Sequence, residues 1–393
     1  MKKLGIICLL SLLVISLSLC RKDVNGPEEE QEEDEEIFDP EIPKPDENVF
    51  NVPLKDLVAL TAVFNETDKV GNFVEKLVLL DYNDPANYKI VKLLVDPDDY
   101  FKYYREDNPS VYEIVTMDQT ITAYAPKFSP DKTKILLGDQ IRHAMDAGPH
   151  LFLYNIIEET GKLLFRDDIM WPLYGNGIST VWNNDNTGFY FTRLPAPFTF
   201  EQAVFYYDFF SKIPEFVYRS RYFAVYPEAL ISPDTLMVFS NDSLVTGQSP
   251  GFYFMDTNGN YLSRLNNPHL LGRSRSGMLI KASGIDWNSR LRLLVYAEAI
   301  QTSHITFKIS VTNLDGTYYI NYTLGEYDND VHPVWGSDGK TILFERNKFN
   351  TIYEMGDPRN SNIMIINIQS GNVIRFIDPR NINGAVGLRF PDY

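Results

Sequence analysis

The sequence predicts an all-β protein, a six-bladed β-propeller of four-stranded antiparallel blades in which the C-terminal strand completes the first blade. Three observations predict this fold. A strand-and-turn motif returns about every fifty residues, each unit holds a second recurring motif, and one strand is left over at the C-terminus. A fixed period of this length is typical of stacked supersecondary units, and four strands in each unit are typical of propellers.

Each unit begins with a short strand that runs into a turn containing Asp. The second turn Asp follows the first by 54 residues, the third comes 49 residues later, and the last lies 104 residues further on, which is two periods. A degenerate copy at 285–290 fills the gap. The clear copies are Ala125–Asp131, Thr180–Asp185, Ala229–Asp234 and Pro333–Asp338.

The rest of each unit predicts three more strands. A hydrophobic strand such as Lys134–Leu137 follows the turn, and a third strand ends in Asp or Asn before a tight turn, as at Asp256 before Gly259. Turns of this type between apolar runs are the strongest short-range signal of a β-hairpin. A large sandwich or two smaller barrels is the alternative arrangement of these strands.

The two ends of the chain supply one blade between them. Residues 57–64, 75–82 and 88–95 give three strands, and residues 385–392 give a fourth. Asp392 lies 54 residues after Asp338, which places it at the turn position of the repeat. We therefore expect the last strand to pair with the first, which also removes two exposed sheet edges.

The N-terminus has the features of a bacterial lipoprotein signal. Lys2 and Lys3 precede an apolar stretch, residues 4–19, that is short for a membrane span. Leu17–Cys20 resembles a lipobox, with Leu19 before the Cys. We predict a signal peptide over residues 1–20 with lipidation at Cys20. An ordinary signal peptide and an uncleaved anchor are the alternatives.

Residues 21–48 are predicted to form a disordered acidic tether, and residues 49–393 the propeller. The tether holds thirteen acidic and three basic residues together with four prolines, so its charges repel and it stays extended. The formal charge of −17 argues against binding to nucleic acid, which requires a basic surface. The only cysteines, Cys8 and Cys20, precede the propeller, so we expect no disulfide or cysteine metal site in it.

The predicted binding surface is the propeller face that carries the long connectors, because short turns have little reach. Glu228 and His332 each stand six residues before a turn Asp, at the start of an inner strand near the rim of the central channel. An aromatic-rich connector either packs on the side of the propeller or takes a peptide or a sugar. The candidate binding residues are Glu228, His332, Ser179, Tyr124, Tyr103 and Tyr104. The long connectors are residues 97–122, 194–203, 266–282 and 346–361.

A metal or acid–base site at the channel mouth is the alternative use of this face. All five histidines fall on it, and His and carboxylate side chains suit zinc or manganese. No paired spacing such as His-Glu-x-x-His is present, so we predict no metal and no cofactor. The histidines are His143, His150, His269, His304 and His332.

The first strands resemble those of one known group of propellers. Phe128–Asp131 and Trp335–Lys340 are similar to the strand motif of the TolB-like, WD-repeat-like β-propeller lipoproteins of bacterial envelopes. The resemblance covers about residues 50–393 and implies a six-bladed propeller, often a periplasmic module for protein–protein interaction. A related propeller is the non-catalytic part of prolyl oligopeptidases. Another related propeller, the oligogalacturonate-lyase-like enzyme, uses a His-rich metal site on such a face. Gly247–Gly251 has the spacing of a nucleophile elbow, but it stands in a connector inside a blade.

Two functional hypotheses follow. The first is a non-enzymatic lipoprotein of the bacterial cell envelope, periplasmic or associated with the outer membrane, whose long-connector face binds a protein or peptide partner. The alternative is a glycan-binding or polysaccharide-lyase-like propeller with a His-containing metal site at the channel mouth.

Overall fold

The computed structural model divides the chain into two compact units, Met1–Glu41 and Ile42–Tyr393, and the residues that it describes all lie in the second. The described ranges are 48–67, 73–91, 100–105, 108–116, 124–138, 151–165, 179–193, 202–219, 225–240, 250–273, 279–301, 305–325, 328–348 and 358–393.

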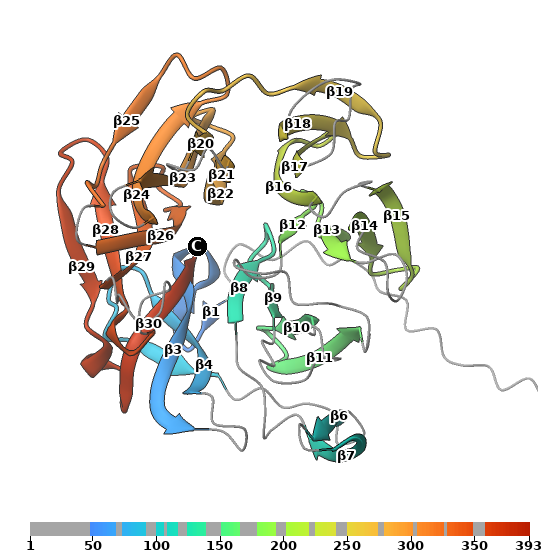
Figure 1. The fold of residues 1–393 in the computed structure, drawn as a ribbon. Helices are drawn as coiled ribbons and strands as arrows, with labels where there is room; N and C mark the ends of the chain where they lie inside the picture. The colour runs from blue at the N-terminus through green and yellow to red at the C-terminus, as the bar shows by residue number, and fades with distance from the viewer. Residues whose placement is uncertain are drawn as a thin grey trace, which may run out of the picture. The chain divides into compact units, whose positions relative to one another are not determined.

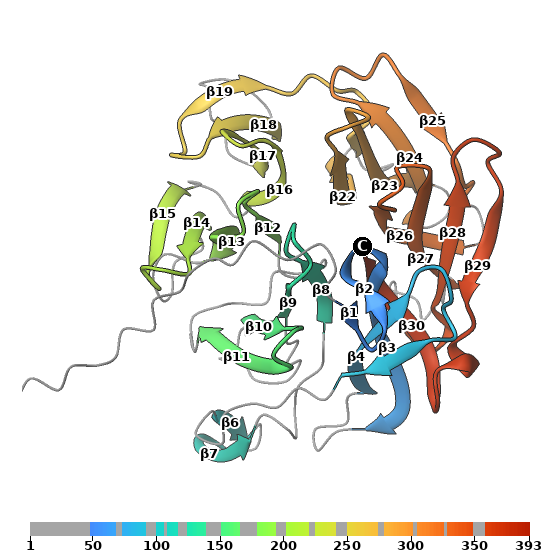
Figure 2. The same cartoon turned by 180° about the vertical axis from the view of Figure 1, so that it is seen from behind.

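Six antiparallel sheets of four strands, the blades, are arranged around a common axis in this part of the chain (Figures 1 and 2). The C-terminal β30 pairs with β3, so the predicted six-bladed propeller and the closure of its first blade are confirmed. Listed from the inner strand outward, blade 1 is β30 (Ala385–Asp392), β3 (Leu57–Thr67), β4 (Phe73–Asp81) and β5 (Tyr88–Ile90); blade 2 is β8 (Tyr124–Phe128), β9 (Lys134–Gly138), β10 (Leu151–Asn155) and β11 (Thr160–Phe165); blade 3 is β12 (Thr180–Trp182), β13 (Gly188–Arg193), β14 (Ala203–Asp208) and β15 (Pro214–Arg219). Blade 4 is β16 (Val225–Ser232), β17 (Thr235–Ser240), β18 (Gly251–Asp256) and β19 (Tyr261–Arg264); blade 5 is β22 (Ser283–Asn288), β23 (Leu293–Gln301), β24 (Ile305–Asn313) and β25 (Tyr319–Asn321); blade 6 is β26 (Asp328–Trp335), β27 (Thr341–Lys348), β28 (Asn362–Asn367) and β29 (Val373–Ile377).

The recurring Asp and Asn residues of the sequence fold the turns. Asp131 Oδ1 accepts hydrogen bonds from the backbone nitrogen and the hydroxyl of Thr133, at 3.0 and 2.9 Å. At the end of the third strand of blade 4, Asp256 Oδ1 accepts from the backbone nitrogens of Asn258 and Asn260. Short polar side chains that bond to the backbone two residues onward are the reason such residues favour turns. The repeat in the sequence is therefore a repeat of turn geometry.

A β-bulge interrupts the inner strand in blades 1, 2, 5 and 6. Two residues there oppose one on the neighbouring strand, and the first of the two has a positive φ. This conformation costs a residue other than glycine roughly 1–2 kcal/mol. Bulges bend a strand and re-aim its side chains, and these four recur at the same level of the ring. The residues are Ala125 (49°), Gly284 (59°), His332 (52°) and Phe390 (48°).

The bulges correct one detail of the predicted repeat. Phe390 in β30 corresponds to His332 in β26, so Asp392 aligns with Lys127 of β8 and not with the turn residue Asp131. Placing Asp392 at the turn position was wrong. The last repeat is 58 residues long from His332 to its equivalent Phe390, because a long connector separates β27 from β28. A spacing of 54 residues counted from Asp338 therefore ends before the position that is structurally equivalent to Asp338.

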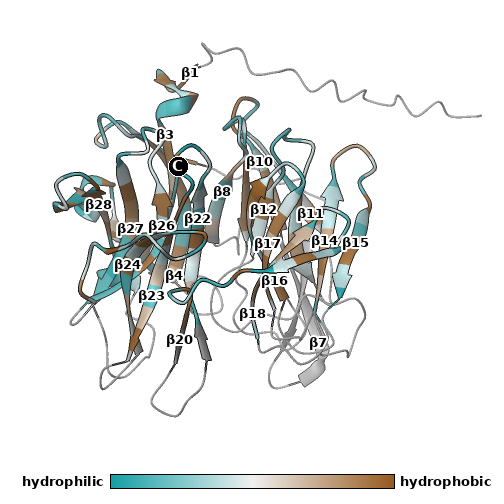
Figure 3. Ribbon diagram, turned by 90° about the horizontal axis from the view of Figure 1, so that it is seen from above, coloured by the Kyte–Doolittle hydropathy of each residue, from teal (hydrophilic) through white to brown (hydrophobic). Residues whose placement is uncertain are grey.

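The hydrophobic core of the described residues consists of six clusters, one at each contact between neighbouring blades. Leu136 of blade 2 packs with Phe189 of blade 3, for example, and Leu343 of blade 6 packs with Leu388 of blade 1. Apolar residues are concentrated in the strands and polar residues in many of the turns (Figure 3). Each blade thus buries both of its faces, and the ring is closed by packing as well as by β30.

Within the described ranges, three small hairpins lie outside the blades. The strands β1 (Asn48–Val49) and β2 (Val52–Pro53) precede blade 1, β6 (Tyr100–Arg105) and β7 (Asn108–Thr116) lie between blades 1 and 2 in the sequence, and β20 (Leu271–Arg273) and β21 (Leu279–Lys281) lie between blades 4 and 5. Short 3₁₀ turns occur at Leu54–Asp56, Pro358–Asn360 and Pro379–Asn381. None of the described segments forms a helix with the length and apolar character needed to cross a bilayer.

Candidate functional site in the central channel

The central channel contains a cavity of about 370 Å³, lined by the inner strands of all six blades. This volume lies within the usual range of ligand sites, roughly 300–1,000 Å³. One register position, directly before the aromatic residue in most blades, contributes a lining side chain from every blade. The six residues at this position are Lys127, Val181, Ala229, Asp286, Val334 and Asp392.

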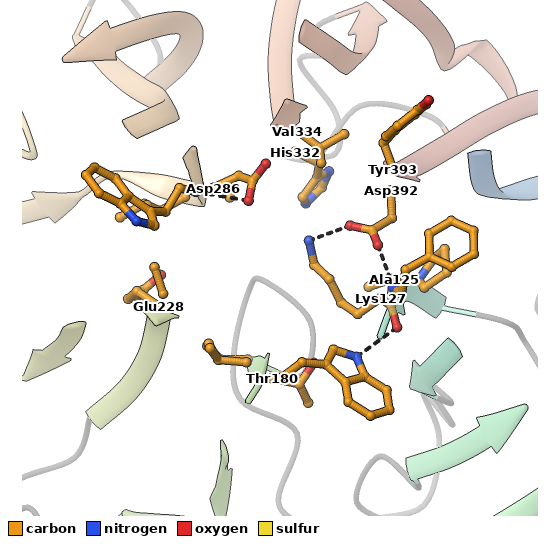
Figure 4. Close-up of a pocket in the computed structure, with 18 of the residues that line it drawn as sticks. Ala125, Lys127, Thr180, Glu228, Asp286, His332, Val334, Asp392 and Tyr393 are labelled. Atoms are coloured by element: carbon orange, nitrogen blue, oxygen red, sulfur yellow. Dashed lines mark hydrogen bonds and ion pairs between the residues drawn. The ribbon is translucent and has the colours of Figure 1, made fainter. Parts of the chain in front are cut away.

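Lys127 and Asp392 form an ion pair between blades 2 and 1, with Nζ 2.9 Å from Oδ1 (Figure 4). The other carboxylate oxygen of Asp392 accepts a hydrogen bond from the backbone nitrogen of Phe128, at 2.6 Å. Burial acts to lower the pKa of Lys127, but the carboxylates of Asp392 and Asp286 outweigh this effect and raise the pKa above its ordinary value. Lys127 is therefore a cation at neutral pH.

Asp286 of blade 5 faces the same space and has a different environment (Figure 4). Its oxygens accept hydrogen bonds from the backbone nitrogens of Trp287, at 2.9 Å, and of Trp335 in blade 6, at 2.8 Å. Burial raises the pKa of Asp286 and Asp392 raises it further, while Lys127 and the backbone N–H groups offset only part of the increase. Asp286 forms no ion pair with any residue that the structure describes.

Glu228 and Lys281 form a second ion pair in the cavity. Glu228 stands at a register shift in β16, and Lys281 is the last residue of β21. Burial raises the pKa of Glu228, and Lys281 compensates only partly. The ammonium of Lys281 also lies 4.6 Å from the centre of the Tyr226 ring, a distance typical of a cation–π contact. The charge of each partner is therefore matched within the pair.

His332 is held by a buried carboxylate. Its Nδ1 lies 3.1 Å from Oε2 of Glu345, a side chain with no exposed surface. Burial acts to raise the pKa of Glu345, but Arg389 and His332 outweigh it and hold the pKa at about 2. An ionised carboxylate only accepts hydrogen bonds, so Nδ1 of His332 donates. Nε2 has no hydrogen-bond partner among the described residues, and His332 lines the cavity.

Lys132 lies at the turn end of the channel. Its ammonium donates a hydrogen bond to the backbone oxygen of Leu57, at 2.9 Å, and lies 3.4 Å from the centre of the Tyr393 ring. Burial lowers the pKa of Lys132 to about 7, and the carboxylates of Asp392 and Asp56 offset only part of the effect. Lys132 thus connects blade 2 to both strands at the seam of blade 1.

The structure brings part of the predicted binding set to this cavity. Ser179, Glu228 and His332 line it, and the hydroxyl of Ser179 donates to the backbone oxygen of Pro227. For the other three candidates, Tyr124 in β8 and Tyr103 and Tyr104 in β6, the structure describes only the backbone. Cys20, the predicted lipidation site, lies outside the described residues.

The charged residues at the shared register position were missed by sequence reasoning, as was Glu345. Lys127, Asp286 and Asp392 were not selected, because the repeat was aligned on the turn Asp. A residue-Pro pair stands at the bulge in three blades, and alignment on those prolines identifies Asp392 as the counterpart of Lys127. The pairs are Ala125-Pro126, His332-Pro333 and Phe390-Pro391.

The described histidines do not gather into a metal site. His269 stacks on Tyr319 of blade 5, with 3.9 Å between the ring centres, and it does not line the cavity. The other three histidines, His143, His150 and His304, lie outside the described residues. Over the described ranges, no group of three or more His, Cys, Asp or Glu side chains is placed to hold a metal ion.

The run with nucleophile-elbow spacing lies between two strands. β17 ends at Ser240, β18 begins at Gly251, and residues 247–249 lie outside the described residues. A nucleophile elbow requires a strand, a sharp turn and a helix. The two flanking strands belong to the same sheet, so this run does not have that context.

Comparison with solved structures places the fold among propellers. TolB from Acinetobacter baumannii is similar over 87% of this chain and 67% of its own, with a TM-score of 0.54 and 11% identity. A protein assigned as TolB from Agrobacterium tumefaciens is similar over 68% and 84%, with a TM-score of 0.47 and 15% identity. A chain of a nidogen/laminin complex is similar over 86% and 97%, with a TM-score of 0.50 and 10% identity. No protein-family model and no curated protein sequence matches the chain. At these identities the similarity is one of fold.

Proposed function

We propose that this chain, a propeller with the TolB-type fold, is a non-enzymatic scaffold of the bacterial envelope that binds an extended segment of a partner protein in its central channel. The observation that carries this proposal is the cavity of about 370 Å³ to which all six blades contribute. Its walls combine charged and apolar side chains, a mixture suited to a peptide with a polar backbone and apolar side chains.

The partner enters from the long-connector face. Ser179, Glu228 and His332 stand one or two residues to the connector side of the shared register position in their blades. The Nε2 atom of His332 has no hydrogen-bond partner among the described residues. The turn end carries Lys132, which is engaged with Leu57 and Tyr393 at the seam. Free hydrogen-bonding groups therefore favour the connector end as the entrance.

Photocrosslinking in whole envelopes tests the site and the direction of entry. Thr180 and Asn184 both line the cavity from blade 3, one before and one after Trp182. With p-benzoylphenylalanine in place of Thr180 we expect a covalent adduct with one partner protein. The matched variants carry it in place of Asn184, at the turn end, or in place of Phe210, which is 84% exposed on the β14–β15 turn. Adducts from the Phe210 variant alone contradict the channel, and adducts from the Asn184 variant alone contradict the entrance.

The lipid anchor belongs to the same proposal. It rests on the resemblance of Leu17–Cys20 to a lipobox, and it gives the propeller a fixed place at a membrane. Replacement Cys20→Ser is expected to move the protein from the membrane fraction to the soluble envelope fraction. Cys8→Ser, which alters the other cysteine, is expected to leave it on the membrane. Membrane retention of the Cys20→Ser protein contradicts lipidation at this residue.

One observation favours a second candidate, a glycan-binding or lyase-like propeller. A His oriented by a buried carboxylate is the usual arrangement of a general base, and His332 with Glu345 has this arrangement. Incubation with oligogalacturonides, followed by ultraviolet absorbance of the unsaturated product, tests it. Turnover that is lost in His332→Gln supports the second candidate. Turnover that persists in that variant, or no turnover, supports the scaffold.

A further inference from the structure

One carboxylate in the channel has no ion-pair partner among the described residues. Three carboxylates line the channel, and two of them are matched in ion pairs, Asp392 with Lys127 and Glu228 with Lys281. The third, Asp286, accepts two backbone hydrogen bonds and forms no ion pair with a described residue. Each of its oxygens has capacity for a further donor. A ligand that brings one positive charge would complete the pairing inside the cavity.

The inner strands of blades 5 and 6 lie close together at Asp286. A Cβ added to Gly284 of blade 5 would lie 3.0 Å from Cα of His332 in blade 6, and the side chains of Asp286 and His332 both line the cavity (Figure 4). The ionised carboxylate of Glu345 accepts a hydrogen bond from Nδ1 of His332 and holds the ring in place, and Nε2 has no partner among the described residues.

We propose that the channel recognises a basic group of the bound segment, the ammonium of a lysine or the guanidinium of an arginine. Asp286 is its counter-ion. This inference rests on the proposed function and specifies the chemistry of the segment. An anionic group is disfavoured, because it would face three carboxylates, while Lys127 and Lys281 are paired and Lys132 contacts the backbone oxygen of Leu57 and the Tyr393 ring. The formal charge of −17 on the whole chain attracts a basic partner over a longer range.

Four capped five-residue peptides test the preference. Each consists of glycines around one central residue, and that residue is lysine, arginine, norleucine or glutamate. Binding is measured by titration calorimetry with the full chain at neutral pH. The lysine and arginine peptides are expected to bind at least about tenfold more tightly than the norleucine peptide, because hydrogen bonds to charged groups are stronger than those between neutral groups. Norleucine has the four-carbon chain of the lysine side chain without the ammonium group, so the ratio isolates the ammonium.

A substitution at Asp286 tests whether this carboxylate causes the preference for a basic group. Asp286→Asn keeps the size of the side chain, and the ratio of lysine to norleucine affinity is expected to fall to about one. The control is Asp378→Asn, which removes a carboxylate paired with Arg375 and Arg380 at the surface and is expected to keep the full ratio. The ratio measured on the unmodified chain decides the proposal even if the Asp286→Asn protein fails to fold.

The outcomes separate this inference from the function on which it rests. Equal affinities for the lysine and norleucine peptides, tightest binding of the glutamate peptide, or no binding of any peptide overturns the basic-group proposal. If a partner adduct still forms at position 180 in those cases, the peptide-binding channel stands and only its preference is wrong. If no adduct forms at position 180, the proposed function fails as well.

Discussion

Glu345 is a fully buried carboxylate whose hydrogen bonds cross the seam between blades 6 and 1. Besides His332, its oxygens accept hydrogen bonds from the hydroxyl of Ser361 at 3.0 Å, from Asn347 at 3.1 Å and from Arg389 at 3.4 Å. A buried charge costs free energy unless it is paired and hydrogen-bonded, and this one has both kinds of partner. It also fixes the ring of His332, so it serves folding and the channel together.

Loss of this charge is expected to destabilise the fold. In Glu345→Gln, Arg389 keeps its ion pair with Glu75, at 3.1 Å, and loses the one with Glu345, while His332 loses its anionic acceptor. Removal of one partner from a buried ionic network costs about 3 kcal/mol or more of unfolding free energy, measured by urea denaturation. Glu159→Gln is the control, since Glu159 pairs with Lys89 at the surface, and it is expected to cost less than about 1 kcal/mol. Equal losses in the two variants contradict the role of burial.

Glu345 also predicts a dependence of stability on pH. Its pKa is about 2 in the folded chain against an ordinary value of 4.5, so its contribution is complete above pH 4.5 and is lost as the pH falls through 2. The loss amounts to about 3 kcal/mol, because each unit of pKa corresponds to about 1.4 kcal/mol. The free energy of unfolding is therefore expected to fall more steeply between pH 4.5 and 2 in the unmodified chain than in Glu345→Gln. Parallel curves contradict this assignment.

At the residue level, the sequence predicted which positions stand near the channel better than it predicted their partners. Counting back from the turn Asp selected Glu228 and His332, and both line the cavity. The same count did not find Lys281, which comes from a hairpin between blades, or Glu345, which lies on a second strand. A contact between residues of different strands depends on register and rotamer, and neither leaves a local pattern in the chain.

At the level of elements, a β-bulge directly before the shared register position recurs in the inner strands of four blades. Glycine at 284 has a φ of 59°, and a Cβ added there would lie 3.0 Å from Cα of His332 and 3.1 Å from Cδ of Pro333. A side chain at this position would therefore meet both a strained backbone and the neighbouring blade. The absence of a Cβ allows blades 5 and 6 to approach.

A pair of glycine substitutions separates these two effects. Gly371 has a φ of 68°, and a Cβ added there has no neighbour within 4 Å. Gly371→Ala is expected to cost about 1–2 kcal/mol of unfolding free energy, the penalty of the left-handed conformation alone. Gly284→Ala is expected to cost more, because the blade contact must also open. Urea denaturation measures both, and an equal cost shows that the contact between blades 5 and 6 tolerates a methyl group.

Strands were predictable from the sequence, and bulges were not. Asp131 and Asp256 mark turns through bonds to nearby backbone, so their spacing gave the four strands of a unit and the period of the ring. A bulge inserts one residue into a ladder without a composition of its own. Its trace here is the residue-Pro pair, and proline also occurs in ordinary loops.

At the level of the whole molecule, closure depends on the strand that the C-terminus adds to blade 1. Leu388 has no exposed surface and packs in the cluster between blades 6 and 1. Asp392 and Tyr393 contact blade 2 through Phe128 and Lys132. The last nine residues therefore join three blades. The sequence predicted this closure correctly, although the spacing used to support it matched the wrong residue, because a spare strand and a three-stranded blade require each other.

Removal of residues 385–393 is expected to open the ring. The inner edge of β3 would lose its partner, and the cluster between blades 6 and 1 would lose Ala385 and Leu388. We therefore expect loss of most of the folding stability, which for a domain is about 5–15 kcal/mol, together with aggregation. Addition of a synthetic peptide of residues 384–393 is expected to restore a soluble monomer in size-exclusion chromatography. The same peptide with Leu388→Asp is expected not to. A truncated chain that remains monomeric with an unchanged urea midpoint contradicts this account.

The register position shared by the inner strands has a consequence for how such propellers diversify. Its apolar members, Val181, Ala229 and Val334, pack with the cores between blades, whereas its charged members belong to none of the six clusters. Lys127, Asp286 and Asp392 are held instead by an ion pair and by hydrogen bonds from backbone nitrogens. Substitution of the charged residues at these three positions can therefore change which groups the channel binds, while the hydrophobic clusters between the blades keep their residues.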